Sequence, residues 1–195
     1  MNDTINKLLQ QIRELEQQIE EALYQRAEQL RYRIYNGRVI FEREVLSLHR
    51  SLKVGALDYI RRARWAVILT APVIYSLIVP FVVLDIAVSL YQAICFPIYN
   101  IPKVKRSDFL SFDRFKLRYL NSIEKINCAY CSYGNGIAAY VQEVAARTEQ
   151  YWCPIKNAKL KKGMHHRYCL FTDYGDAEQY RQQLKTIKQN FSDND

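Results

Sequence analysis

Four cysteines and two histidines between residues 128 and 169 are the residues best suited to metal or thiol chemistry. Two thiols separated by two residues lie one helical turn apart, so one short stretch of backbone can offer both to a single metal ion. Zinc prefers four nitrogen or sulfur ligands in a tetrahedron, and later residues can complete the set. The spacing predicts a structural zinc site formed by Cys128, Cys131, Cys153 and His165, with Cys169 or His166 as the alternative fourth ligand.

The same side chains are compatible with three other interpretations. An iron–sulfur cluster would use all four thiols. A Cys-x-x-Cys pair can also cycle between dithiol and disulfide, which makes a thiol-disulfide or metal-dependent redox protein the enzyme alternative. That pair usually follows a strand in an alternating β/α pattern, and the sequence before Cys128 predicts no such strand. In the last interpretation the cysteines simply pack in a small, tyrosine-rich helical core.

A long apolar stretch precedes these cysteines. Residues 65–102 contain a single charged residue, Asp85, and residues 66–84 are uncharged and long enough for a membrane-spanning helix. One continuous helix over Trp65–Tyr99 would be roughly 50 Å long, whereas the hydrocarbon core of a bilayer is about 30 Å thick. We therefore expect a membrane-embedded helical hairpin that bends between Pro80 and Asp85. One span followed by an interfacial helix is the alternative.

Basic residues flank the apolar stretch on both sides, in a chain of net charge +8. Anionic lipid headgroups attract Lys and Arg next to a membrane segment by about 1 kcal/mol each. Near-equal basic flanks favour a hairpin with both ends on the cytosolic side. The membrane segment explains the basic charge, so no nucleic acid partner is expected. The residues expected to contact lipid headgroups are Arg61, Arg62, Arg64, Lys103, Lys105 and Arg106.

The N-terminal part of the chain predicts two helices. Residues 4–34 carry apolar side chains at spacings of three and four, which is typical of a coiled coil with a protein partner or a second copy. An antiparallel helical hairpin with the next helix is equally compatible, and Asn36-Gly37 would supply its break. Residues 38–64 predict a basic amphipathic helix at the bilayer surface. The stripe consists of Ile5, Leu8, Ile12, Leu15, Ile19 and Ala22.

The C-terminal part predicts a small Cys/His-rich helical module. A short helix should lead to Cys128, a turn should follow at Gly134–Gly136, and an amphipathic helix should occupy residues 137–150 with Glu143 and Glu149 on its solvated side. The domain boundaries that we predict are a coiled-coil helix over 1–36, a basic amphipathic helix over 37–64, a membrane segment over 65–102, a linker over 103–118, the Cys/His-rich module over 119–190 and a frayed tail over 191–195.

Three strings of the sequence resemble a family of uncharacterised bacterial membrane-associated proteins. They are APVIYSLIVPFVVLD, LYQAICFPIYNIPKV and NCAYCSYGNG…ARTEQYWCPIK, and the resemblance covers residues 37–175. No activity is known for that family. The resemblance therefore implies a membrane-associated architecture and carries no functional residues to this chain.

The sequence as a whole predicts an all-α protein at the bacterial inner membrane, with both termini in the cytosol. It contains no Gly-rich phosphate loop and no nucleophile elbow, and no signal peptide is visible. The leading function is a membrane-anchored scaffold or accessory subunit of a membrane assembly, with a C-terminal module that zinc stabilises. Whether the chain is an enzyme stays open, and the sequence favours a non-enzymatic role. A lipid-binding or membrane-shaping factor is the third class of function.

Overall fold

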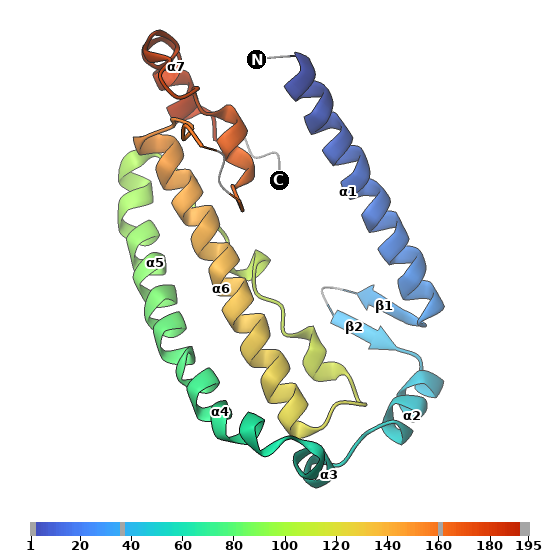
Figure 1. Cartoon of the computed structure of the whole chain (residues 1–195). Coiled ribbons are helices and arrows are strands. Elements are labelled where there is room, and N and C mark those ends of the chain that lie inside the picture. Colours follow the sequence, from blue (N-terminus) through green and yellow to red (C-terminus); the bar gives the residue numbers. More distant parts are fainter. Residues whose placement is uncertain (1–2, 36–37, 160–161, 192–195) are drawn as a thin grey trace. The chain divides into compact units, whose positions relative to one another are not determined.

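The computed structural model describes residues 3–35, 38–159 and 162–191 (Figure 1). The chain is mostly helical, which confirms the expected class. It divides into two compact units, which we describe one at a time. The first unit comprises Met1–Arg62 and Asp113–Lys125, and the second comprises Ala63–Phe112 and Ile126–Asp195.

The first unit places a two-stranded sheet between helices. The strands are antiparallel, with Tyr32 opposite Phe41 and Ile34 opposite Val39. Aromatic and β-branched side chains favour such cross-strand pairs. The elements of this unit are α1 (Asp3–Gln29), β1 (Tyr32–Tyr35), β2 (Arg38–Phe41), α2 (Arg43–Ser51), α3 (Ala56–Arg62) and the 3₁₀ turn η2 (Asp113–Lys116).

The sheet corrects both helices that the sequence predicted for this unit. The helix expected over 4–34 ends at Gln29, and the helix expected over 38–64 is divided into β2, α2 and α3. Pairing between the strands outweighs the apolar spacing that favoured continuous helices, because propensity is a weak guide once side chains can pack across strands. The break expected at Asn36-Gly37 lies outside the described residues.

The apolar stripe of α1 remains exposed within the first unit. The element that follows α1 is a strand, which weakens the alternative of a helical hairpin with the next helix. The side chain of Ile5 lies outside the described part of the chain. The side chains of the stripe that are at least 50% exposed are Leu8, Ile12, Leu15 and Ile19, with Leu23 beyond them.

The second unit is built on two long helical segments that run antiparallel, α4–α5 and α6 (Figure 1). The Tyr75 hydroxyl at the end of α4 donates to the Asn127 side chain, and the Tyr91 and Thr148 hydroxyls meet at 3.1 Å. The elements of this unit are α4 (Trp65–Ser76), α5 (Ile78–Tyr99), the 3₁₀ turn η1 (Arg106–Asp108), α6 (Ser122–Trp152, which begins in the first unit), the 3₁₀ turn η3 (His166–Leu170) and α7 (Ala177–Gln189).

The bend expected between Pro80 and Asp85 is wrong, because α5 continues through both residues. The interruption comes earlier, at Leu77 between α4 and α5. Pro80 lies in the first turn of α5, where a backbone N–H has no partner within the helix, so the missing donor costs little. The apolar stretch is therefore a nearly continuous helical segment that pairs with α6 instead of folding back on itself.

The turn expected at Gly134–Gly136 is also wrong, because both glycines lie inside α6. A Cβ atom at Gly134 would lie 3.1 Å from the Phe81 ring, and one at Gly136 would lie 2.5 Å from the Phe109 carbonyl oxygen. The two glycines therefore allow close approach of neighbouring chain to the helix. Close packing therefore explains why glycines, which in the sequence are typical of a turn, occur inside this helix.

A small core lies where α5, α6 and the segment after α5 meet. Val104 and Phe191 are buried in it, so the expected linker over 103–118 and the expected frayed tail over 191–195 each contribute a core residue. Residues 192–195 lie outside the described part of the chain. The core residues are Phe96, Ile101, Val104, Tyr140, Val144 and Phe191.

Candidate functional site

The predicted zinc ligands are spread along the second unit. Cys131 and Cys153 lie on or just beyond one continuous helix, α6, and a rise of 1.5 Å per residue separates them by roughly 33 Å along its axis. Sulfur ligands of one zinc ion lie within about 4 Å of each other, as Zn–S bonds near 2.3 Å require. One site containing Cys128, Cys131 and Cys153 is therefore incompatible with this helix.

The other predicted ligands have separate surroundings. The His165 Nε2 atom lies 3.0 Å from the Glu149 carboxylate, and the His165 ring packs against Tyr168 and Phe171. His166 and Cys169 are exposed in η3. Among the described residues, no group of three or more His, Cys, Asp or Glu side chains is placed to hold a metal ion.

The Cys128–Cys131 pair lies on α6, one turn apart, and both cysteines are free thiols. Cys128 lies in the second turn of α6, beyond the first turn in which a helix N-terminus acts most strongly on a charged group. A reactive dithiol is usually placed at that first turn. The redox alternative therefore stays a prediction without support from the position of these thiols.

A buried ion cluster joins α6 to η3. The Glu143 carboxylate accepts a hydrogen bond from Arg147 at 2.7 Å and another from Arg167 at 3.0 Å. All three side chains are largely buried, so the expectation that Glu143 is solvated is wrong. The spacing of four residues between Glu143 and Arg147 on one helix could have predicted their ion pair from the sequence. The contribution of Arg167, from a distant 3₁₀ turn, had no local signal.

A second polar cluster surrounds Asp85, the one charge in the apolar stretch. Asp85 is buried on the side of α5 that faces α6. Arg106 binds it in a bidentate manner, through Nε at 2.9 Å and Nη2 at 2.6 Å. The Tyr133 hydroxyl donates to the same carboxylate at 2.9 Å. The sequence predicts that Asp85 lies at a turn, at an interface or against a basic partner. In the structure Arg106 is that basic partner.

The Asp85 carboxylate affects both of its partners. The hydrogen bond to Asp85 raises the pKa of Arg106. Burial, followed by the hydrogen bond to Asp85, raises the pKa of Tyr133 above its ordinary value. Both groups therefore keep their protons through the neutral range, and Arg106 stays a cation that neutralises Asp85.

Polar groups continue along the inner side of α5. The Gln92 side chain donates to the Val104 carbonyl at 3.2 Å and accepts from the Val104 amide at 3.0 Å. It also donates to the Tyr140 hydroxyl of α6. These contacts fix the chain after α5 against the helical pair. The polar groups on this side of α5 are therefore satisfied by protein.

We expect replacement of Asp85 by alanine to destabilise the second unit by about 2 kcal/mol. The change removes the acceptor of Arg106 and Tyr133, and loss of one partner of a fully buried ion pair costs about 3–5 kcal/mol. Arg106 is almost half exposed, so water compensates part of the loss. Thermal unfolding in detergent measures the effect, and Asp108→Ala, an exposed carboxylate in η1, is the control. Equal stability of the two variants would contradict a structural role for the pair.

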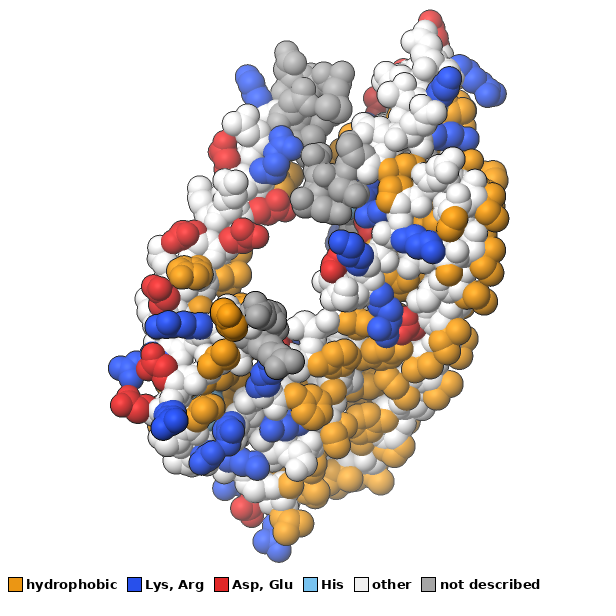
Figure 2. All heavy atoms as spheres, turned by 180° about the vertical axis from the view of Figure 1, so that it is seen from behind, with side chains coloured by type: hydrophobic (Ala, Val, Ile, Leu, Met, Phe, Trp, Pro, Cys, Tyr) orange, Lys and Arg blue, Asp and Glu red, His pale blue; other side chains and the backbone are white. Residues whose placement is uncertain are grey.

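The outer side of α4–α5, which faces away from α6, is apolar, whereas the inner side of α5 carries polar groups. Figure 2 shows hydrophobic side chains gathered over this segment. Trp65–Tyr99 is the one stretch among the described residues that is long and apolar enough to cross a membrane. Residues spaced by three and four along its outer side are about 60% exposed, namely Val79, Val83, Ile86 and Leu90. The helical segment therefore has one side covered by protein and one apolar side without a cover in the second unit.

The residues expected to contact lipid headgroups divide into two groups. Arg61, Arg62, Arg64, Lys103 and Lys105 are exposed, at the two ends of the apolar stretch in the sequence. Arg106 is almost half exposed and also binds Asp85, so its assignment as a headgroup contact stays a prediction.

Comparison of the chain with protein-family models, curated proteins and solved structures found no match.

Proposed function

We propose that the chain is a monotopic membrane protein, and that it serves as a non-enzymatic scaffold or accessory subunit of a membrane assembly. In this proposal the outer side of α4–α5 enters one leaflet of the bilayer, and α6 faces water. The observation that carries it is the division of α4–α5 into a polar inner side satisfied by α6 and a continuous apolar outer side.

Lipid explains the exposed side chains better than water does. Full burial of a Val, Leu or Ile side chain contributes about 1.5–3 kcal/mol. The free energy gained when lipid buries the many exposed apolar side chains of α4–α5 therefore far exceeds the free-energy cost of binding to a membrane surface. Trp65 and Tyr99 mark the two ends of the stretch, and such aromatic residues favour the membrane–water interface. A large apolar patch on a protein surface usually marks an interaction site of this kind.

Three observations favour partial immersion of α4–α5 in one leaflet over a helix that crosses the whole bilayer. The irregular segment 101–112 packs against the α5–α6 pair, and irregular backbone does not occur in contact with lipid hydrocarbon. On the side of α6 away from α5, Asn135 and Gln142 are exposed. The helical stretch is also roughly 50 Å long, against a core of about 30 Å. A helix lying along the surface satisfies all three observations.

The scaffold role rests on α1 together with the membrane surface. The exposed stripe of α1 suits a coiled coil with a protein partner or a second copy, which is how a membrane-bound subunit can recruit others. The cytosolic face of the bacterial inner membrane remains the proposed location, in line with the basic flanks and the family resemblance. A zinc-stabilised module is left out of this proposal, because α6 holds its predicted ligands apart.

Two exposed thiols, one within α6 and one just after its C-terminal end, test the orientation. Variants keep either Cys131 or Cys153, with the other four cysteines changed to serine, and the protein is added to preformed phosphatidylglycerol/phosphatidylcholine vesicles. We expect the chain to float with the vesicles and a membrane-impermeant maleimide to label both variants fully. A helical pair that crosses the bilayer would protect one of the two thiols until detergent is added. A chain that fails to float would contradict membrane binding altogether.

A further inference from the structure

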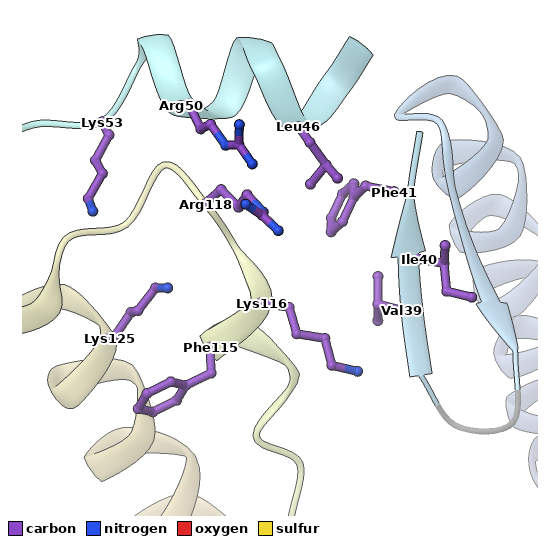
Figure 3. A pocket seen from close by; sticks show the side chains of 10 residues that line it. All are labelled: Val39, Ile40, Phe41, Leu46, Arg50, Lys53, Phe115, Lys116, Arg118 and Lys125. Carbon is purple, nitrogen blue, oxygen red and sulfur yellow. The ribbon is translucent and has the colours of Figure 1, made fainter. Parts of the chain in front are cut away.

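A hollow in the first unit combines positive charge with apolar side chains. Its volume is about 700 Å³, which is within the range of small-molecule sites in proteins. Figure 3 shows Arg50 and Lys53 extending toward the 113–125 segment, and Lys125 extending toward them from the start of α6. The lining residues are Val39, Ile40, Phe41, Leu46, Arg50, Lys53, Phe115, Lys116, Arg118 and Lys125.

The charges around the hollow are all of one sign. Five of the lining residues are Lys or Arg, and none is Asp or Glu. Among the described residues, no ion pair involves any of these five, whereas Arg31 of the same unit lies 3.0 Å from the Glu44 carboxylate. Like charges that share a concave space repel one another and raise the local concentration of anions. An anionic ligand would relieve that repulsion.

The chemistry of the lining narrows the class of anion. Arginine offers a planar fork of donors that binds phosphate in a bidentate manner, and lysine adds a compact charge. Arg50 and Arg118 come from α2 and from the segment before α6, so donors reach the hollow from two elements. Phe41 and Phe115 add apolar surface at the same place. The lining is thus suited to a phosphate group that is attached to an apolar body.

We propose that this hollow binds a phosphate-bearing amphiphile. A phospholipid headgroup with part of its acyl chains and a soluble phosphate ester with an apolar substituent share this chemistry. The proposal goes beyond membrane anchoring by α4–α5, because a different unit supplies every lining residue.

Calorimetric titration of the full-length protein in a non-ionic detergent tests the proposal at about 0.15 M salt, where long-range charge effects are screened. The probes are inorganic phosphate, phenyl phosphate, short-chain phosphatidic acid and short-chain phosphatidylcholine. We expect an apolar phosphate ester to bind more tightly than inorganic phosphate. Preference for phosphatidic acid identifies a lipid headgroup as the source, and preference for phenyl phosphate identifies a soluble ester. Equal, weak binding of all four probes would overturn the proposal.

A matched pair of variants assigns the binding to the hollow. Arg50→Gln/Arg118→Gln should weaken binding of the preferred probe by at least about tenfold, since a tenfold change is the scale of one lost charge-assisted hydrogen bond. Arg13→Gln/Arg33→Gln removes the same charge from exposed positions of the same unit outside the hollow and should change binding less than about twofold. An equal loss in both variants, at unchanged circular dichroism, would show that net charge alone attracts the anion.

Two further measurements separate this proposal from the alternatives. Flotation of Arg50→Gln/Arg118→Gln with vesicles should remain, because α4–α5 is intact, so the two proposals can fail independently. A single-stranded oligonucleotide should not displace the preferred probe. Displacement of the probe by the oligonucleotide at lower concentration would overturn the proposal in favour of a nucleic acid site.

Discussion

In a Val83→Glu/Leu90→Glu variant, we expect partition onto phosphatidylglycerol/phosphatidylcholine vesicles to fall by about a thousandfold. Both side chains lie on the outer side of α5 and are about 60% exposed. Each replacement removes apolar burial in lipid and adds a carboxylate that lipid solvates poorly, at a cost of about 2 kcal/mol per position near the membrane surface. Two positions give about 4 kcal/mol, which corresponds to roughly a thousandfold in partition. Glutamate is preferred to lysine because a lysine can reach anionic headgroups.

The control for this variant is Ile34→Glu/Tyr35→Glu. These side chains of β1 are about as exposed as the two on α5, and their replacement changes the net charge by the same amount. Vesicle flotation as a function of lipid concentration measures the partition of both variants. We expect the control to keep its partition within about threefold, because salt screens the repulsion between two added surface charges and the anionic lipid. A control that loses as much partition as the α5 variant would mean that net charge, and not the apolar side of α5, governs binding.

The helical class and the position of the apolar segment could be predicted from the sequence, but its course could not. A long run of apolar residues predicts which part of the chain forms an apolar helix, and Trp65–Tyr99 is such a helical segment in the structure. The sequence predicts a bend near Pro80, although a proline in the first turn of a helix interrupts no hydrogen bond. The bend depended on where α5 begins, and helix boundaries are the least predictable feature of a sequence.

The residue types of the candidate site could also be predicted from the sequence, but their contacts could not. The side chains that contact one another there are far apart in the chain. Cys-x-x-Cys predicts two ligands at most, and whether Cys153 can join them depends on the course of the chain between them. Gly134 and Gly136 indicated a turn that would have allowed it, but they serve close packing inside α6. A buried Asp85 could be expected to need a cation, whereas the choice of Arg106 over its basic neighbours needed the structure.

Replacement of Glu143 by alanine is expected to destabilise the second unit by about 3 kcal/mol or more. The carboxylate is the acceptor that Arg147 and Arg167 share, and the three side chains are at most 11% exposed. Loss of one partner from a buried ion cluster costs about 3–5 kcal/mol, because the remaining charges were arranged around it. The lower end of that range applies here, since Arg147 also donates to the Pro102 carbonyl and Arg167 to Gln150.

Glu149→Ala is the matched control, since it makes the same chemical change six residues along the same helix. The Glu149 side chain is 36% exposed, and its one described partner is His165, so its loss should cost less than about 1 kcal/mol. The midpoint of thermal unfolding in detergent should fall by about 10 °C for Glu143→Ala and by about 3 °C at most for Glu149→Ala, on the scale that applies to chains of this length. Similar shifts for the two variants would mean that water reaches the Glu143 cluster in solution. In that case the contact between α6 and η3 would not depend on ion pairing, and the apolar packing of Tyr168 and Phe171 beside it would have to hold η3 in place.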